Sequence, residues 1–504
     1  MRKWLPLVAV CLGTFMLLID VTIVNVALPD MAVDLSTSFS SLQWVIDVYA
    51  LVLAALLLGA GSASDIVGRR KVYLVGLVIF ALASLASGAA PDGAFLIAAR
   101  GVQGVGGAAM FATTVALLDV SYQGRERGIA YGVWGAVAGA AAATGPIVGG
   151  VLTESLSWRW IFFVNLPISA VAIWLSLAVL GAERGEHRGR VDLAGMLSFT
   201  AVAALLTYSF IRAGEDGWSS AVPIALQVVA VVLLIAFVVI ERRASSPMLD
   251  LSLFADRRFV GVMIAALFFS LSAFSTLPYA SVWLQSVLGM SPVQAGLVFL
   301  PLSLASFVVS AAIGRVLHGA NPRWLVGGGL LLVGAGALAQ AVLNSGSRWP
   351  ALAGGLFLVG VGVGLVNPTM TSAVMSAAPR QRGGMAAGAM NTARQLGLAF
   401  GIAALGTIFS SRVAGVLRDH QIPGASDIAA AASGGQSQAV LAGAPADRRA
   451  NLDALIHSAF ASGLNTIFVV AGVISLVGGV AVLILLRPVR QTATTAAMAE
   501  PVTG

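Results

Sequence analysis

The sequence has few charged residues and almost no cysteine. Of its 504 residues, 10% are Asp, Glu, Lys or Arg, 58% are hydrophobic, and one is a cysteine, Cys11. Soluble proteins carry about 25% charged residues, so this composition excludes a soluble enzyme or a disordered chain and predicts a membrane protein. One cysteine excludes an internal disulfide, and with only four scattered histidines we expect neither a metal site nor a bound cofactor.

Long hydrophobic runs repeat along the chain. A helix needs about 20 apolar residues to cross the hydrocarbon core. The sequence contains fourteen such runs, at residues 5–29, 42–63, 72–90, 94–118, 128–151, 161–180, 193–212, 220–240, 259–285, 293–315, 324–343, 351–374, 385–409 and 459–486. The strict alternation of a β-barrel strand is missing, so the predicted fold is an all-α polytopic membrane protein with fourteen spans.

The positive charge indicates orientation rather than a nucleic-acid partner. The basic residues are scattered between the runs, and most of the 29 Lys and Arg fall on one side if the N-terminus is cytoplasmic. This bias predicts that both termini are cytoplasmic in a multi-pass protein of the bacterial cell membrane. The one long outer loop, about 410–458, is rich in Ala, Gly, Ser and Gln, and we expect a poorly packed linker there.

A short sequence pattern occurs in both halves of the chain. Residues 61–71 and 314–323 both place arginines after a glycine that ends a span. Transporters built from six-span repeats show such echoes. We therefore predict an N-terminal six-helix bundle at 1–180, two inserted helices with their loops at 181–258, a C-terminal six-helix bundle at 259–490 that includes the outer loop, and a cytoplasmic tail at 491–504.

Three charged residues lie inside the first-half spans, where each costs about 2.5–3.5 kcal/mol. At 1.5 Å per residue, Asp20, Asp47 and Arg100 lie about 14, 8 and 9 Å from the outer end of their spans, so their side chains could meet. Carboxylates that share an arginine form a coupled titrating cluster, as proton-driven exchange requires. A permanent structural ion pair between Asp20 and Arg100 is the alternative. Gln103 and Gly107 share the face of Arg100.

Small residues and a charged turn mark two further regions. Gly135, Gly139, Gly145, Pro146, Gly149 and Gly150 lie in the fifth span, where they allow close helix packing, either ordinary or as a sealed contact between the halves. In the turn that contains Gly61, Asp65, Gly68, Arg69 and Arg70, the acid can hold the start of a neighbouring helix and Gly68 permits the turn.

Six motifs together resemble those of the major facilitator superfamily, and specifically its 14-span drug:proton antiporters of the EmrB/QacA type. They are residues 18–29, 61–71, 100–107, 145–150, 158–167 and 391–397, in order and on the expected spans, although Ala63 and Ile66 depart from the usual loop motif. The resemblance covers about 1–490. It implies a link of Arg100 to proton transfer and of the 145–150 motif to export, and a substrate class of amphipathic, often cationic, drugs.

The sequence thus predicts a proton-coupled multidrug exporter, driven by the proton gradient and functional as a monomer, with a narrow exporter of a metabolite or self-made antibiotic as the alternative. Without a Walker loop or a cluster of nucleophile, metal and acid–base groups, ATP drive and a membrane enzyme are excluded. The polar residues within spans give candidate cavity residues: Gln103, Tyr279, Gln285, Asn367, Asn391 and Gln395. Arg394 lies inside a span too, and snorkelling to the cytoplasmic interface is an alternative role for it.

Overall fold

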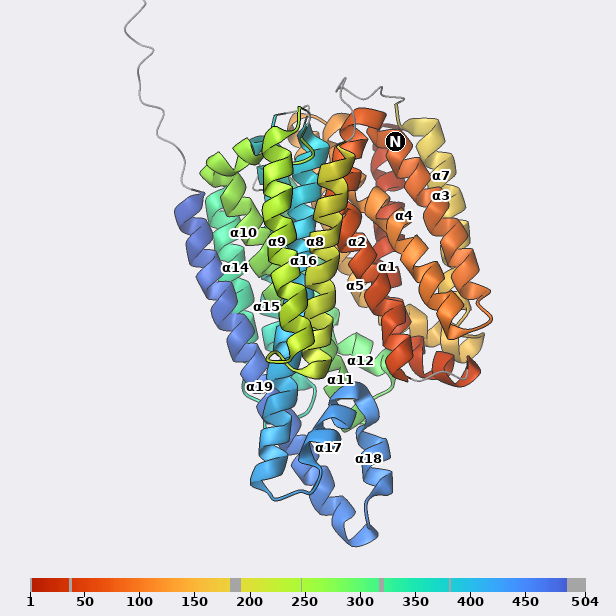
Figure 1. Cartoon of the computed structure of the whole chain (residues 1–504), viewed down its shortest axis with the longest axis vertical. Helices are drawn as coiled ribbons and strands as arrows, with labels where there is room; N and C mark the ends of the chain where they lie inside the picture. Colours follow the sequence, from red (N-terminus) through yellow and green to blue (C-terminus); the bar gives the residue numbers. More distant parts are fainter. Residues whose placement is uncertain are drawn as a thin grey trace, which may run out of the picture.

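The computed structural model describes residues 2–35, 39–181, 192–245, 247–316, 321–379 and 382–486. The elements of this part of the chain are helices, most of them long and running side by side (Figure 1). The first half of the chain contains η1 (Arg2–Trp4), α1 (Leu5–Asp34), α2 (Phe39–Val67), α3 (Arg69–Gly88), α4 (Gly93–Ser121), α5 (Gly124–Ser155), α6 (Trp160–Phe163) and α7 (Asn165–Val179). Here α4 packs between α2 and α3, and α1 packs against α5 and α7.

The second half repeats this plan with more broken helices. It contains η2 (Leu251–Ala255), α10 (Arg257–Ala273), α11 (Leu277–Val282), a π-helical turn η3 (Trp283–Val287), α12 (Pro292–Val298), α13 (Leu300–Val316), α14 (Pro322–Gln340), α15 (Pro350–Ala377), α16 (Gly383–Asp419) and α19 (Ala446–Leu485). α2 meets α16 and α5 meets α13, and these two helix pairs form the largest contacts between the halves.

Two helices stand between the halves in the sequence. α8 (Leu193–Asp216) and α9 (Ala221–Arg243) form a hairpin, and α8 packs against both α2 and α16 (Figure 1). α9 exposes a row of large apolar side chains, among them Val228, Val232 and Ile235. An apolar face of this kind is what lipid tails would contact.

Eleven helical segments of the described residues are long and apolar enough to cross a membrane. α5, which is rich in glycine and alanine, is not among them. α8 and α13 contain shorter apolar helices, Leu193–Ser209 and Leu300–Ile313. The N-terminal helix and the end of α19 lie at the same end of the molecule (Figure 1).

The expectation of a poorly packed linker at 410–458 is wrong, because this segment is mostly helical. α16 runs on to Asp419, and α17 (Ala425–Ala431), a π-helical turn η5 (Ala432–Gln436) and α18 (Ser437–Gly443) follow before α19 begins at Ala446. Val413, Leu417 and Ala429 are buried in the hydrophobic core of the second half. The many alanines make this segment only weakly hydrophobic, which suggested a loop, but alanine is also the strongest helix former.

Candidate functional site

A buried ion pair lies inside the first half, where α1 meets α4. Arg100 donates from Nη1 to Oδ2 of Asp20, and neither residue exposes any surface. A second Arg100 nitrogen, Nε, donates to the carbonyl of Val45 in α2 at 3.0 Å. The three helices α1, α2 and α4 therefore meet at one guanidinium.

Two amides complete the shell around the carboxylate. Gln103, one turn after Arg100 on α4, donates to Asp20 Oδ1 at 3.1 Å while its own Oε1 accepts from Arg100 at 2.7 Å. Asn165, at the start of α7, donates to the same Asp20 oxygen at 3.1 Å. Ser84 of α3 accepts from both amides, at 3.2 and 2.9 Å. Five side chains from four helices thus form one closed network.

Aromatic rings close the site on two sides. The Arg100 guanidinium lies 4.2 Å from the ring centroid of Tyr49 and 5.7 Å from that of Phe162. The Tyr49 hydroxyl is buried without a hydrogen-bond partner. A ring over a desolvated guanidinium adds about 2 kcal/mol of attraction.

The predicted approach of Asp20 and Arg100 and the place of Gln103 on the face of Arg100 agree with this geometry, while their roles in transport stay a prediction. Asp47 belongs to α2, but its side chain lies outside the described part of the structure. Asn165 and Ser84 were not predicted as site residues. The available signal was the uncharged amide of Asn165 within the apolar stretch before Pro167.

A second carboxylate, Asp65, joins the two halves at the end of the molecule where the N-terminus lies. Asp65 Oδ1 accepts from the backbone N–H of Gly384 at 3.0 Å, and Oδ2 accepts from that of Met385 at 2.9 Å. These are the first free N–H groups of α16, so Asp65 caps a helix of the other half. Arg69 donates to the same carboxylate at 3.3 Å. The predicted hold of Asp65 on a neighbouring helix is confirmed.

Glycines allow this contact to close. A Cβ on Gly61 would lie 2.5 Å from the carbonyl oxygen of Gly384, and one on Gly388 would lie 3.1 Å from that of Leu57. The backbones of α2 and α16 therefore touch. Gly68 has a φ of 108° between α2 and α3, which confirms that the turn needs a glycine. Arg70 donates to the carbonyl of Leu177 at 2.8 Å. The corresponding turn of the second half, at 317–320, lies outside the described residues.

The fifth-span glycines serve two different contacts. A Cβ on Gly139 would lie 3.0 Å from Ser306 Oγ, and one on Gly135 3.6 Å from Pro368 Cδ, so both face the other half. A Cβ on Gly149 would instead lie 2.8 Å from the Ile23 carbonyl, and Gly145 faces Thr22, both on α1. Gly145 and Gly149 thus serve ordinary helix packing within the first half, whereas Gly135 and Gly139 lie at the contact between the halves. α5 continues through Pro146 and the buried Gly150; the Pro146 side chain lies outside the described part.

The cavity candidates of the second half do not form one cluster. Tyr279 donates to the Ile402 carbonyl at 2.7 Å, and Gln285 of η3 donates to Ser281 of α11 at 2.9 Å. Deeper in the bundle, Asn367 Oδ1 and both amide atoms of Asn391 are buried without a partner. Gln395 follows Asn391 by one turn and is half-buried.

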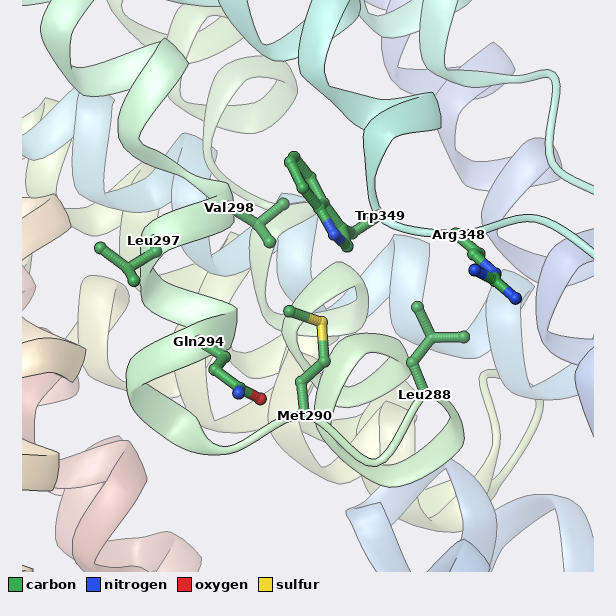
Figure 2. Close-up of a pocket in the computed structure, with 7 residues that line it drawn as sticks. All are labelled: Leu288, Met290, Gln294, Leu297, Val298, Arg348 and Trp349. Atoms are coloured by element: carbon green, nitrogen blue, oxygen red, sulfur yellow. The ribbon is translucent and has the colours of Figure 1, made fainter.

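A surface cavity of about 540 Å³ lies apart from all of these residues. Leu288, Met290 and Gln294 line one side and Trp349 closes the other, with the Met290 and Trp349 side chains pointing toward one another (Figure 2). Three of its lining residues, Gln294, Leu297 and Val298, belong to α12, and the others lie in the turns beside it (Figure 1). The predicted cavity residues are absent from its walls, so it is not the site that the sequence indicates.

Known proteins resemble the chain over most of its length. Residues 10–402 match the family model described as Major Facilitator Superfamily. The multidrug resistance protein Stp of Mycobacterium tuberculosis is 37% identical over 420 residues, which cover 82% of this chain and 78% of Stp. The puromycin resistance protein pur8 of Streptomyces alboniger is 38% identical over 426 residues, with coverages of 83% and 84%.

A third relative and a solved structure extend the likeness. The tetracenomycin C resistance and export protein of Streptomyces glaucescens is 32% identical over 485 residues, which cover 94% of this chain and 90% of that protein. The crystal structure of the human organic anion transporter MFSD10 has a similar fold, with a TM-score of 0.63 at 16% identity over 96% of this chain and 99% of that one. The chain belongs to the Major Facilitator Superfamily and is a multi-pass transporter of the bacterial cell membrane.

Proposed function

We propose that the chain exports amphipathic, often cationic, drugs or antibiotics in exchange for protons, by alternating access between its two halves. The names of its relatives, a multidrug resistance protein and a puromycin resistance protein, support the substrate class. The observation that carries the proton coupling is the Asp20–Arg100 pair, because a fully buried carboxylate among helices within the membrane is a natural proton acceptor.

The network gives this exchange a physical route. Protonation of Asp20 cancels its charge and releases Arg100 from its ion pair, so α1 and α4 lose that ion pair and keep the hydrogen bond from Gln103 to Asp20. Arg100 keeps Val45 and Gln103 as partners, which prevents an isolated buried charge. Each proton that moves with a 100 mV potential supplies about 2.3 kcal/mol. Asp47 is the second proposed carboxylate of the cluster.

The contact between the halves would be the part that opens. In this structure α2 and α16 are closed together at the end where the N-terminus lies, and Asp65 holds the start of α16. Breaking that cap would separate the halves at this end, while the small residues Gly135 and Gly139 let α5 slide on α13. We assign this end to the cytoplasm, because most basic residues lie in its connections.

The finer architecture is part of the proposal. Counting α5, α8 and α13 with the eleven apolar segments gives fourteen spans, which would place the chain with the EmrB/QacA-type antiporters. The transporter would need no cofactor and would act as a monomer. Its partners would be protons, drug molecules and the lipid bilayer.

A narrower function is the second candidate. The tetracenomycin C resistance and export protein is similar over nearly the whole chain, and its name joins export to resistance against one compound. This protein would then export a single metabolite or self-made antibiotic. A broad panel of dyes and drugs separates the two functions, because a narrow exporter would transport almost none of them.

The test is uptake of a fluorescent cationic dye into inside-out vesicles under an imposed pH gradient. Wild type, Asp20→Asn and Asp92→Asn are compared at equal amounts of folded protein. Asp92 is the matched control, since its carboxylate caps its own helix through the Phe95 N–H at 2.8 Å. Gradient-driven uptake that is lost only in Asp20→Asn supports the proposal. Uptake that does not depend on the pH gradient refutes proton coupling. Equal uptake by all three proteins shows that Asp20 is not needed for coupling and has a structural role.

A further inference from the structure

Arg394 is an arginine of the membrane interior that has no carboxylate partner. It lies eleven residues after Gly383, the first residue of α16, which is about 16 Å along the helix and near the middle of a core about 30 Å thick. Among the described residues the structure gives its guanidinium no ion pair and no hydrogen bond. Its guanidinium lies over the ring of Phe269, 5.7 Å from the ring centroid.

The contrast with Arg100 shows what is missing. Arg100 has a carboxylate, an amide oxygen and a backbone carbonyl as acceptors, besides the ring of Tyr49. Arg394 has the ring alone. A cation–π contact at this distance is much weaker than a charge-assisted hydrogen bond to a carboxylate. Charged residues within spans pair with one another or mark a substrate path, and Arg394 is not paired within the described part of the chain.

A second polar group lies unsatisfied on the same face of α16. Asn391 precedes Arg394 by three residues, so their side chains are neighbours on the helix. Asn391 is completely buried, and neither its amide nitrogen nor its amide oxygen has a hydrogen-bond partner. Buried amides without partners are rare in folded proteins, and each calls for an explanation such as a missing ligand.

This face of α16 looks toward the first half. Gly388 and Gly384, one and two turns before Asn391, contact the backbone of α2, and Ala387 packs in the core of the first half. The residues that follow along this stripe therefore lie where the halves meet. Arg394, three residues after Asn391, lies over Phe269 of α10 at the edge of this stripe. Among the described residues, the Arg394 guanidinium and the Asn391 amide N–H are both donors without an acceptor.

We propose that Arg394 binds an anionic group of the transported molecule, such as a carboxylate, and that Asn391 donates a second hydrogen bond to it. Arg394 recognises the carboxylate through paired N–H groups, which lysine cannot reproduce. The inference rests on the proposed export function and deepens it, because it adds amphipathic anions and zwitterions to the cations expected as substrates.

The test measures dye binding to the purified full-length protein by fluorescence polarisation. Two probes are compared: a rhodamine with a free carboxylate, and its methyl ester, which lacks that negative charge. Arg394→Gln should weaken binding of the carboxylate dye about 10-fold or more and leave the ester unchanged. Arg394→Lys should restore part of the loss. Arg412→Gln is the control, since Arg412 lies further along α16 and bonds Ser462 at 3.2 Å.

The outcomes separate this site from the export function. Equal weakening of both dyes by Arg394→Gln would show that Arg394 only supports the helix packing, which overturns the proposal. A wild type that binds the ester but not the carboxylate dye also overturns it, while cation export stands. If vesicles show no transport of either dye, drug export fails, and the binding difference between the two dyes still decides the site.

Discussion

Removing the charge of Asp65 should open the contact between α2 and α16. In Asp65→Asn one oxygen can still accept from Gly384 or Met385, but the amide nitrogen cannot accept from the other N–H group. A buried donor left without an acceptor costs about 1–3 kcal/mol, and the lost charge at the helix start costs about 0.3–1 kcal/mol more. Since 1.4 kcal/mol is a factor of ten, the closed state should lose about 10-fold or more in population.

Cysteine labelling can measure this opening. Cys11, the chain's one cysteine, is replaced by serine, and a reporter is introduced by Ala387→Cys. Ala387 is completely buried against the first half, one turn into α16, so labelling by a membrane-impermeant maleimide reports separation of the halves. We expect the labelling rate in Asp65→Asn to rise about 10-fold, in line with the population change.

Asp92→Asn is again the matched control. It removes the same charge from a helix cap, but this cap lies within the first half, where Asp92 accepts from the Phe95 N–H of its own helix α4. Its labelling rate should equal that of the parent protein. The reasoning is refuted if Asp65→Asn leaves labelling unchanged, or if both variants raise it equally, because the effect would then come from general loosening.

Two further substitutions test other contacts. Gly61→Ala places a Cβ 2.5 Å from the Gly384 carbonyl, so it should raise the same labelling rate, whereas Gly101→Ala, whose Cβ would meet nothing nearer than 3.6 Å, should not. Asn165→Ala removes one hydrogen-bond donor from the buried Asp20 carboxylate, and the loss of a hydrogen bond to a charged group costs about 1.5–3 kcal/mol. The thermal unfolding midpoint of the purified protein should therefore fall, and an unchanged midpoint would contradict a place for Asn165 in the network.

The charged core of the site could be predicted from the sequence because buried charges must find partners. Asp20 and Arg100 have comparable depths in their helices, and the three-residue spacing puts Gln103 on the face of Arg100. The sequence could predict that Asp65 caps the start of a helix, but not which helix it caps. Its partner Gly384 lies 319 residues away, and only the packing of the halves brings the two together.

The contacts of α5 were harder to predict, for a geometric reason. At 100° per residue, the six residues from Gly139 to Gly145 rotate the helix by 600°, so the two glycines lie about 120° apart around its axis. One therefore faces the second half and the other faces α1. Asn165 was not predicted as a site residue because a single uncharged amide forms no recognisable sequence pattern. It reaches Asp20 only because α7 begins at this residue.

The hairpin of α8 and α9 makes the two seams between the halves unequal. Thr200 of α8 donates to the Ala55 carbonyl of α2 at 3.2 Å, and Trp218, in the hairpin turn, donates to Thr407 of α16 at 2.9 Å. α8 thus covers the α2–α16 seam from outside, while the seven-residue helix α12 and the helix α15 of the second half each contact both α5 and α13. The two seams therefore differ in what adjoins them, because a helical hairpin outside both bundles lies along one and only helices of the second bundle adjoin the other.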